Sequence, residues 1–212
     1  MNFMRKILSI ILIFTVLANA NLLFATTILK MDIDQIAIQA ELVFEGEVLV
    51  RESRRESNSG TINTYVTFSI LDVIKGSYGA DNIELKFAGG SIGGEIVEVN
   101  GLLIPKEGEQ GIYFVESINR DLINPLIGWS QGHFIVQEES GRRIVYTVDN
   151  KPVRDIQSVS SIPPTIKKLS SVIKSDSDVA SGVLVGENQE VMTLEESLLV
   201  EELKSRILEM LK

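Results

Sequence analysis

The chain has 212 residues, of which 44% are hydrophobic and 23% are charged, a balance typical of a globular protein rather than a disordered one. It contains no cysteine, which excludes disulfides, thiolate nucleophiles and cysteine-based metal sites. Its net charge of −9 repels phosphate backbones and anionic lipid surfaces. We therefore expect no nucleic-acid partner.

The first 25 residues have the pattern of an export signal. Arg5 and Lys6 precede an apolar run over residues 7–18, which matches the charged and hydrophobic regions of a secretory signal. Small residues predict cleavage either after Ala20 or after Ala25. Removal of all 25 residues, which include two cations and no acids, changes the net charge from −9 to −11.

A retained membrane anchor is the alternative interpretation of this segment, because its apolar character continues to residue 25. A membrane-spanning helix needs about 20 predominantly apolar residues, however, and Asn19 and Asn21 interrupt the run. We predict a cleaved signal and hence an exported protein: periplasmic, on the cell surface or extracellular. After cleavage we expect no stable membrane insertion.

The part of the chain that follows is predicted to be mainly β. Residues 32–40 form a short predicted helix, and from residue 41 the hydrophobic period changes to two. Alternating segments separated by turn sequences predict strands at 41–53, 62–76, 83–88, 95–99 and 110–117 and a hairpin at 132–150. The strand at 110–117 is the most apolar and is expected to be central. Six or seven short strands of this kind are typical of a closed barrel or a sandwich.

The C-terminal part has a helical period instead. A helix is predicted at 163–175 after tandem prolines, then a linker at 175–190, and then an amphipathic helix at 193–212. Thr193 and Glu196 form the expected capping box of this last helix. Its leucine-rich face is expected to dock on the chain's own barrel. The alternatives are a tethered partner-binding helix and a homo-oligomer formed through 193–212.

Four glycines, Gly89, Gly90, Gly93 and Gly94, lie close together and raise the question of a phosphate-binding loop. Such a loop is followed by a helix, and in the Walker type by a lysine, whereas here no lysine follows Gly94 and the next segment alternates as a strand. We interpret the four as structural glycines that supply positive φ angles and a bulge between two strands.

A polar and aromatic cluster at 124–134 is the best candidate for a ligand- or partner-binding site. It contains Asn124, Gln131, the only tryptophan, Trp129, and the only histidine, His133. Trp129 either fills the core or offers a flat platform for binding. We interpret His133 as structural rather than catalytic, because a lone histidine near aromatic residues lacks the partners that catalysis requires.

No catalytic, metal-binding or cofactor-binding constellation is recognised in the sequence. One histidine without any cysteine excludes a two-histidine metal site. Residues 128–132 match the letters G-x-S-x-G around Ser130, but this loop enters a strand rather than a helix, so we do not interpret Ser130 as a nucleophile elbow. Paired glutamates at 138–139, 195–196 and 201–202 lie in polar runs that are typical of solvated faces. We predict that the protein is not an enzyme and uses no metal and no cofactor.

The order of the strands resembles the netrin-like/TIMP-like domain, in which a barrel of OB type carries characteristic glycines and aromatic residues. The residues that carry the likeness are Ala40, Val43, Gly46, Val48, Lys75, Gly76, Gly108, Tyr113 and Phe114. Residues 32–150 are also similar to bacterial exported proteins with F-x-G-G-x-x-G-G and N-P-L-x-G-W-x-Q-G motifs. The resemblance implies an OB-like barrel of five to seven strands with a short N-terminal helix and C-terminal α-helices. The zinc-chelating N-terminal cysteine of the metalloproteinase inhibitors is absent here.

We therefore expect four segments: a signal peptide at 1–25, an OB/netrin-like barrel at 26–157, a helix and linker at 158–192, and the amphipathic helix at 193–212. The predicted function is that of an exported, non-enzymatic binding protein of the bacterial envelope. Its partner is expected to be a protein. The resemblance implies an exported metalloprotease as one example, which this chain would bind as an inhibitor or a chaperone. The alternatives are a hydrolase acting on envelope carbohydrate and a structural module that oligomerises through its last helix.

Overall fold

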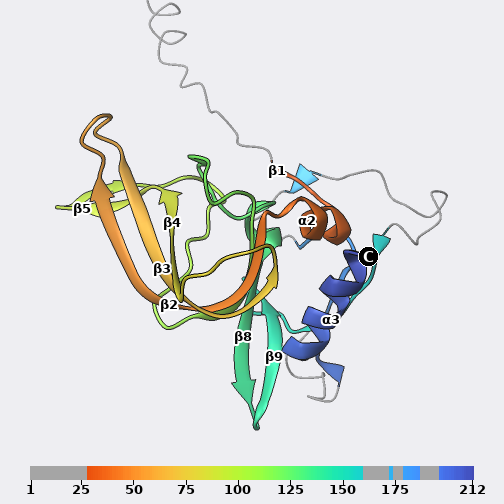
Figure 1. Ribbon diagram of the computed structural model, residues 1–212. Helices are drawn as coiled ribbons and strands as arrows, with labels where there is room; N and C mark the ends of the chain where they lie inside the picture. The colour runs from red at the N-terminus through yellow and green to blue at the C-terminus, as the bar shows by residue number, and fades with distance from the viewer. Residues whose placement is uncertain (1–27, 160–171, 174–178, 187–195) are drawn as a thin grey trace, which may run out of the picture.

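In the computed structural model the described residues are 28–159, 172–173, 179–186 and 196–212 (Figure 1). Their main feature is a six-stranded antiparallel sheet with the order β4-β3-β2-β7-β8-β9. Its strands are β2 (Leu42–Arg55), β3 (Ile62–Lys75), β4 (Asn82–Ala88), β7 (Gln110–Val115), β8 (His133–Glu139) and β9 (Arg142–Thr147). The chain is thus mainly β, as the alternating sequence predicts, and β7 lies inside the sheet as expected.

Three two-stranded ladders and two α-helices complete the fold of the described residues. The small ladders pair β1 (Ile28–Leu29) with β11 (Val172–Ile173), β5 (Gly90–Ile92) with β6 (Glu95–Val97), and β10 (Val153–Ile156) with β12 (Val183–Val185). The helices are α2 (Ile33–Gln39) and α3 (Val200–Met210), and a 3₁₀ turn covers Trp129–Gly132. Figure 1 shows the long β2–β3 hairpin on one side of the molecule and both helices on the other.

The long strands β2 and β3 bend, which gives the sheet a concave face. Their register shifts at three places, the last of them between Val48 and Val50, and such bulges bend a strand. Gly46 lies next to another of these shifts, where a Cβ atom would come within 2.7 Å of the Ser69 carbonyl oxygen and 2.8 Å of the Phe44 ring. A residue without a side chain is therefore needed at this bend.

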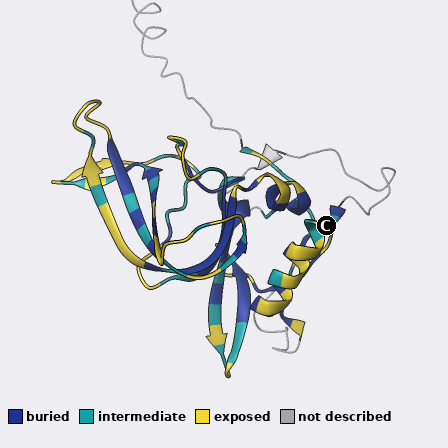
Figure 2. Ribbon diagram, viewed as in Figure 1, coloured by how far each residue is buried: buried dark blue, intermediate teal, exposed yellow. Residues whose placement is uncertain are grey.

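The curved sheet separates two hydrophobic cores. Phe44, Phe68 and Tyr113 fill the core on the concave face, with ring centroids 4.7 to 5.5 Å apart. Phe114 follows Tyr113 directly and points to the opposite face, because side chains alternate along a strand. There it joins the second core, which includes α2, α3, β10 and β12. The buried sides of both helices and of the long strands are visible in Figure 2.

Lys75 and Gly76 join the end of β3 to the end of α2. The Lys75 ammonium donates hydrogen bonds to the carbonyl oxygens of Ala37, Ile38 and Ala40 at 2.6 to 2.8 Å, and so satisfies groups left open by the helix end. Gly76 has a φ of +90°, and a Cβ there would lie 2.5 Å from the Glu41 carbonyl oxygen. The Lys-Gly pair of the resemblance motif thus has a structural role.

The expected barrel is confirmed only as a mainly β architecture with short N-terminal and C-terminal helices. The six-stranded sheet ends at β4 and β9, and no ladder of the described residues joins these two edges into a closed barrel. The β9 edge is covered instead, because Ile144 bridges to Leu199 and the Val145 amide donates to the Leu198 carbonyl. This covering segment prevents closure on that side.

The C-terminal helices differ from the sequence-based prediction. The last helix begins at Val200 rather than at residue 193, because residues 198–199 are extended along β9. Of the helix predicted at 163–175, residues 172–173 form strand β11, and the rest lies outside the described residues. Strand β12 occurs within the expected linker. No helix in the described part of the chain has the length and apolar character needed to cross a membrane.

Candidate functional site

The residues proposed from the sequence as a binding site are used mainly inside the fold. Gln131 is 1% exposed, accepts a hydrogen bond from the Met31 amide at 2.8 Å and donates to the Leu29 carbonyl at 3.1 Å. Asn124 is also buried, and its side-chain oxygen Oδ1 accepts a hydrogen bond from the Leu126 amide at 2.9 Å. These two side chains hold the N-terminal segment and the 124–126 turn in place and are not available to a partner.

Trp129 is the first residue of the 3₁₀ turn and His133 follows the turn, but the two side chains have different surroundings. Trp129 is half-buried and has a φ of +61°, which belongs to the left-handed region that side chains rarely adopt. His133 is 4% exposed, and its Nε2 atom lies 2.8 Å from Glu109 Oε1. Its ring centroid lies 5.0 Å from that of Tyr113. The structure therefore does not bring the four candidate residues together on one accessible surface.

Glu109 is the polar partner that the sequence did not identify. It precedes β7, and the pairing of Tyr113 with His133 between β7 and β8 brings it to the histidine. Burial raises the pKa of the Tyr113 hydroxyl, and the nearby Glu109 carboxylate raises it further. Tyr113 thus stays protonated. The side chains of Glu109, Tyr113 and His133 form a packed polar contact where β7 meets β8.

The four glycines 89, 90, 93 and 94 build a small hairpin above the main sheet. All have positive φ angles, between +59° and +140°. Gly93 and Gly94 form the two-residue turn between β5 and β6. A Cβ at Gly89 would lie 2.6 Å from the Val97 carbonyl oxygen, and one at Gly90 would lie 2.5 Å from the hydroxyl oxygens of Ser53 and Thr64. The glycines allow the hairpin to pack closely against β2 and β3.

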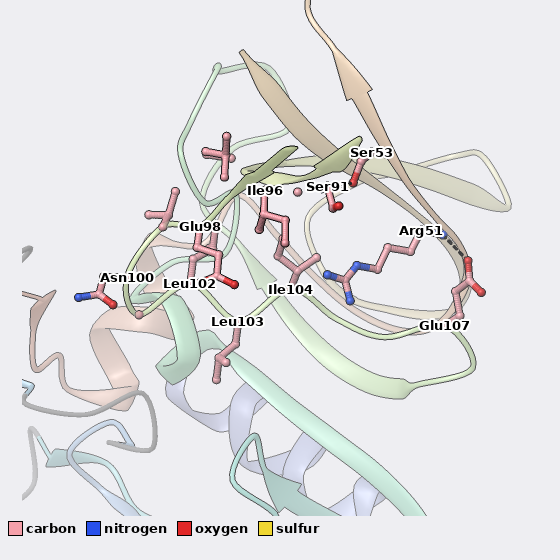
Figure 3. Close-up of a pocket in the computed structure, with 15 residues that line it drawn as sticks. Arg51, Ser53, Ser91, Ile96, Glu98, Asn100, Leu102, Leu103, Ile104 and Glu107 are labelled. Carbon is pink, nitrogen blue, oxygen red and sulfur yellow. Dashed lines mark hydrogen bonds between the residues drawn. The ribbon is translucent and has the colours of Figure 1, made fainter. Parts of the chain in front are cut away.

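This hairpin covers a groove of about 850 Å³, which Figure 3 shows in close-up. One wall comes from β2 and the hairpin, and the other from the segment 98–107. The side chains that give it its character are Arg51, Ser53, Ser91, Ile96, Glu98, Leu102, Leu103 and Ile104. Ile96 is 66% exposed and the neighbouring Val97 is 39% exposed. We name this feature the hairpin groove and take it as the candidate functional site.

Arg51 is the only cation that lines the hairpin groove among the described residues. Its backbone amide donates to Glu107 Oε1 at 2.9 Å, which fixes the wall formed by the 105–109 turn. Its guanidinium group extends into the groove toward Ile104 in Figure 3 and forms no ion pair with a described carboxylate. Arg54, three residues later, is by contrast bound to Glu52 and Glu84 on the outer surface.

A second hollow of about 510 Å³ lies on the other side of β6. It is lined by the 59–63 loop, by Lys86, Asp121 and Ile123, and by Glu95 and Val97 of β6 itself. The three residues of β6 are all exposed, and the strand pairs only with β5 among the described residues. An exposed strand edge with a hollow on each side is suited to binding an extended chain.

The sequence contained only a weak signal for this site. The alternation in residues 95–99 predicts a strand, but it does not tell which side of that strand is left uncovered. Arg51 and Ile96 are 45 positions apart, and only the folded hairpin brings them to one groove. Within the described part of the chain, the groove combines apolar side chains, the Arg51 cation without a carboxylate partner, and a strand edge that pairs with no other strand. These are features of binding.

Comparisons with protein-family models, with curated proteins and with solved structures found no match.

Proposed function

We propose that this chain is an exported, non-enzymatic protein of the bacterial envelope that binds a protein partner in the hairpin groove. The observation that carries the proposal is the exposure of Ile96, 66%, beside Val97 and the Arg51 guanidinium, which forms no ion pair with any described carboxylate. Apolar side chains exposed together in a concave surface with a few polar groups are typical of binding sites. An aliphatic anchor with an arginine beside it is well suited to a protein interface.

The surroundings of His133 support a non-enzymatic role. The only histidine of the chain is 4% exposed and is in contact with Glu109 and Tyr113, so a substrate in solvent does not reach it. The paired carboxylates 138–139 and 201–202 lie at the surface, where Glu139 accepts a hydrogen bond from Tyr146 and Glu202 from the Leu199 amide. These contacts are structural.

Export is proposed from residues 1–25, which lie outside the described residues. Cleavage after Ala20 or Ala25 would leave a chain that begins shortly before β1. The mass of the mature protein from the envelope distinguishes the two cleavage points from a retained anchor, since each leaves a different N-terminus.

We further propose that the sheet is an opened form of the OB-type barrel of netrin-like/TIMP-like domains. Three strands, β2, β3 and β4, curve around the core of Phe44, Phe68 and Tyr113, and the resemblance residues Gly46, Lys75 and Gly76 have structural roles in that curvature and at its ends. An OB-fold is itself a partly open barrel of five strands. The resemblance implies that the partner of this chain is an exported protease, which the chain would inhibit or chaperone.

Affinity capture from envelope extract tests the proposed function. The exported chain should retain a protein partner, and Ile96→Asp should lose it, because a carboxylate in the apolar groove is costly to bury. Leu71→Asp is the matched control, since Leu71 is 51% exposed on β3 and does not line the groove. Capture that is unchanged by Ile96→Asp, or lost equally in both variants, would contradict a binding role for the groove.

A further inference from the structure

We infer that the partner enters the hairpin groove as an extended segment that adds a strand to β6 and presents one acidic side chain to Arg51. This inference rests on the proposed function, because it uses the same groove, and it specifies the chemistry of the occupant. Three features of the described residues support it: the free edge of β6, the hollows on its two sides, and the isolated cation.

The free edge follows from the hairpin register. Ile92 pairs with Glu95 across the two-residue turn, Ser91 pairs with Ile96, and Gly90 pairs with Val97. In a two-residue hairpin the closing pair exchanges hydrogen bonds, and the next pair does not. The amide and carbonyl of Ile96 therefore point away from β5, toward the edge that no described strand occupies. They can bind the backbone of an added strand.

The two hollows fit the alternating side chains of such a strand. Ile96 lines the hairpin groove, whereas Glu95 lines only the second hollow, which also contains Lys86 and Asp121. Lys86 and Asp121 form an ion pair with each other. Side chains of an added strand would alternate between the same two sides. Every second residue of the partner segment would thus contact Ile96 and Ile104, and these partner residues should be apolar.

Charge complementarity defines the acidic position. The chain is acidic, with a net charge of −9, and yet Arg51 extends into the groove without a described carboxylate partner. A guanidinium group binds a carboxylate through two parallel hydrogen bonds, which gives both affinity and orientation. Glu98 and Glu107 also line the groove, so it accommodates a single acidic residue at Arg51 and disfavours a run of acids.

The carboxylate is that of an aspartate or glutamate side chain and not a chain terminus. Terminal carboxylates are captured by groups of free backbone amides. Two amides of lining residues are already used, because the Arg51 amide donates to Glu107 at 2.9 Å and the Ser91 amide donates to Ser53 Oγ at 3.2 Å, and the Ile96 amide would bind the backbone of the added strand. The occupant therefore passes through the groove as an internal segment.

Phage display of random octapeptides on the full exported chain tests this inference. The peptides are fused at their C-termini to the coat protein, so that no terminal carboxylate is present. We expect enriched peptides with one Asp or Glu and apolar residues at alternate positions. Synthetic versions should bind Arg51→Gln about tenfold more weakly than the parent chain, because one charge-assisted pair is lost. Arg54→Gln is the matched control and should bind equally well.

The outcomes separate this inference from the proposed function. Enriched peptides without acids, no enrichment, or equal binding by Arg51→Gln would overturn the acidic-segment inference. If the enriched peptides bind Arg51→Gln as well as the parent chain but no longer bind Ile96→Asp, the groove binds proteins by its apolar surface alone. Binding unchanged by both substitutions would overturn the inference and the proposed function together. Peptides with a methylated backbone nitrogen at alternate positions should also bind more weakly, and equal binding by them would overturn the added strand.

Discussion

At the scale of single residues, the glycines of the 87–99 segment have two different physical roles. Gly93 and Gly94 have open space where a Cβ would lie, so only their positive φ angles require glycine. Gly89 and Gly90 also have positive φ, and in addition their missing side chains allow the hairpin to contact its neighbours. The sequence predicts the first role from the tight turn, but the second depends on segments far apart in the chain.

These roles predict different costs of adding one methyl group. Gly94→Ala should lower the free energy of unfolding by about 1 to 2 kcal/mol, the cost of a left-handed backbone alone. Gly90→Ala should cost more, about 3 kcal/mol or above, because φ is +140° and the new Cβ would lie 2.5 Å from two hydroxyl oxygens. Urea unfolding of both variants measures the difference. Equal losses would contradict the close packing of Gly90 against Ser53 and Thr64.

Asp149 is predicted to make a pH-dependent contribution to stability. Partial burial raises the pKa of its carboxyl group, but hydrogen bonds from Lys151 and Thr147 lower it more, so the pKa lies below 3.8. A depressed pKa in the folded state means that the stabilisation is complete above pH 3.8 and is lost as the pH falls through the folded value.

Asp149→Asn should therefore lose about 0.5 to 1 kcal/mol of unfolding free energy near neutral pH, a modest value because the site is partly exposed. The difference from the parent chain should shrink as the pH falls below 3.8. Asp81→Asn, at an exposed turn, is the control and should change little at any pH. A loss for Asp149→Asn that is the same at all pH values would contradict the predicted linkage.

At the scale of elements, α3 docks on the chain's own sheet. Val200, Leu203 and Ile207 are buried in the core that also contains Phe114 and Val145. Lys204 adds an ion pair of 2.5 Å with Glu45, which is 2% exposed on β2. Arg143 of β9 also pairs with Glu45, so the buried carboxylate is held by one cation from α3 and one from β9. An oligomer formed through 193–212 stays an untested alternative.

Leu203→Ala should consequently lower the free energy of unfolding by about 2 to 5 kcal/mol, through lost burial and a cavity. Leu208→Ala should cost less than about 0.5 kcal/mol, because Leu208 is 47% exposed on the same helix. Denaturation at several protein concentrations measures both effects. A loss for Leu203→Ala that appears only at high concentration would instead indicate that α3 packs between protein copies.

The elements differ in how well the sequence predicts them. Hairpins such as β8–β9 follow from local alternation and from the Ser140–Gly141 turn, both of whose residues have positive φ. The start of α3 does not follow from local sequence, because Thr193 and Glu196 predict that the helix begins at residue 193. The edge of β9 instead takes residues 198–199 as an extended partner, and Glu202 accepts a hydrogen bond from the Leu199 amide. A contact distant in sequence thus overrides local preference.

At the scale of the whole molecule, the curvature of the sheet determines where a binding surface is available. Bending of β2 and β3 encloses the aromatic core, and the folded-over β5–β6 hairpin leaves a groove beside it. Gln131, His133 and Asn124 are suited to binding by their sequence alone. In the fold, Gln131 binds the Met31 amide, His133 pairs with Tyr113 of β7, and Asn124 binds the Leu126 amide of its own turn. The local sequence predicted a polar segment, whereas the burial of its side chains depends on contacts with segments distant in the sequence.

The central claim is that the hairpin groove contacts a protein partner, and site-specific photocross-linking in cells tests it most directly. A benzoylphenylalanine placed at position 96 lies at the groove, and one at position 71 lies on an exposed part of β3 away from it. We predict a discrete cross-linked product from position 96 that is absent from position 71. No product at position 96, or the same product at both positions, would contradict the claim.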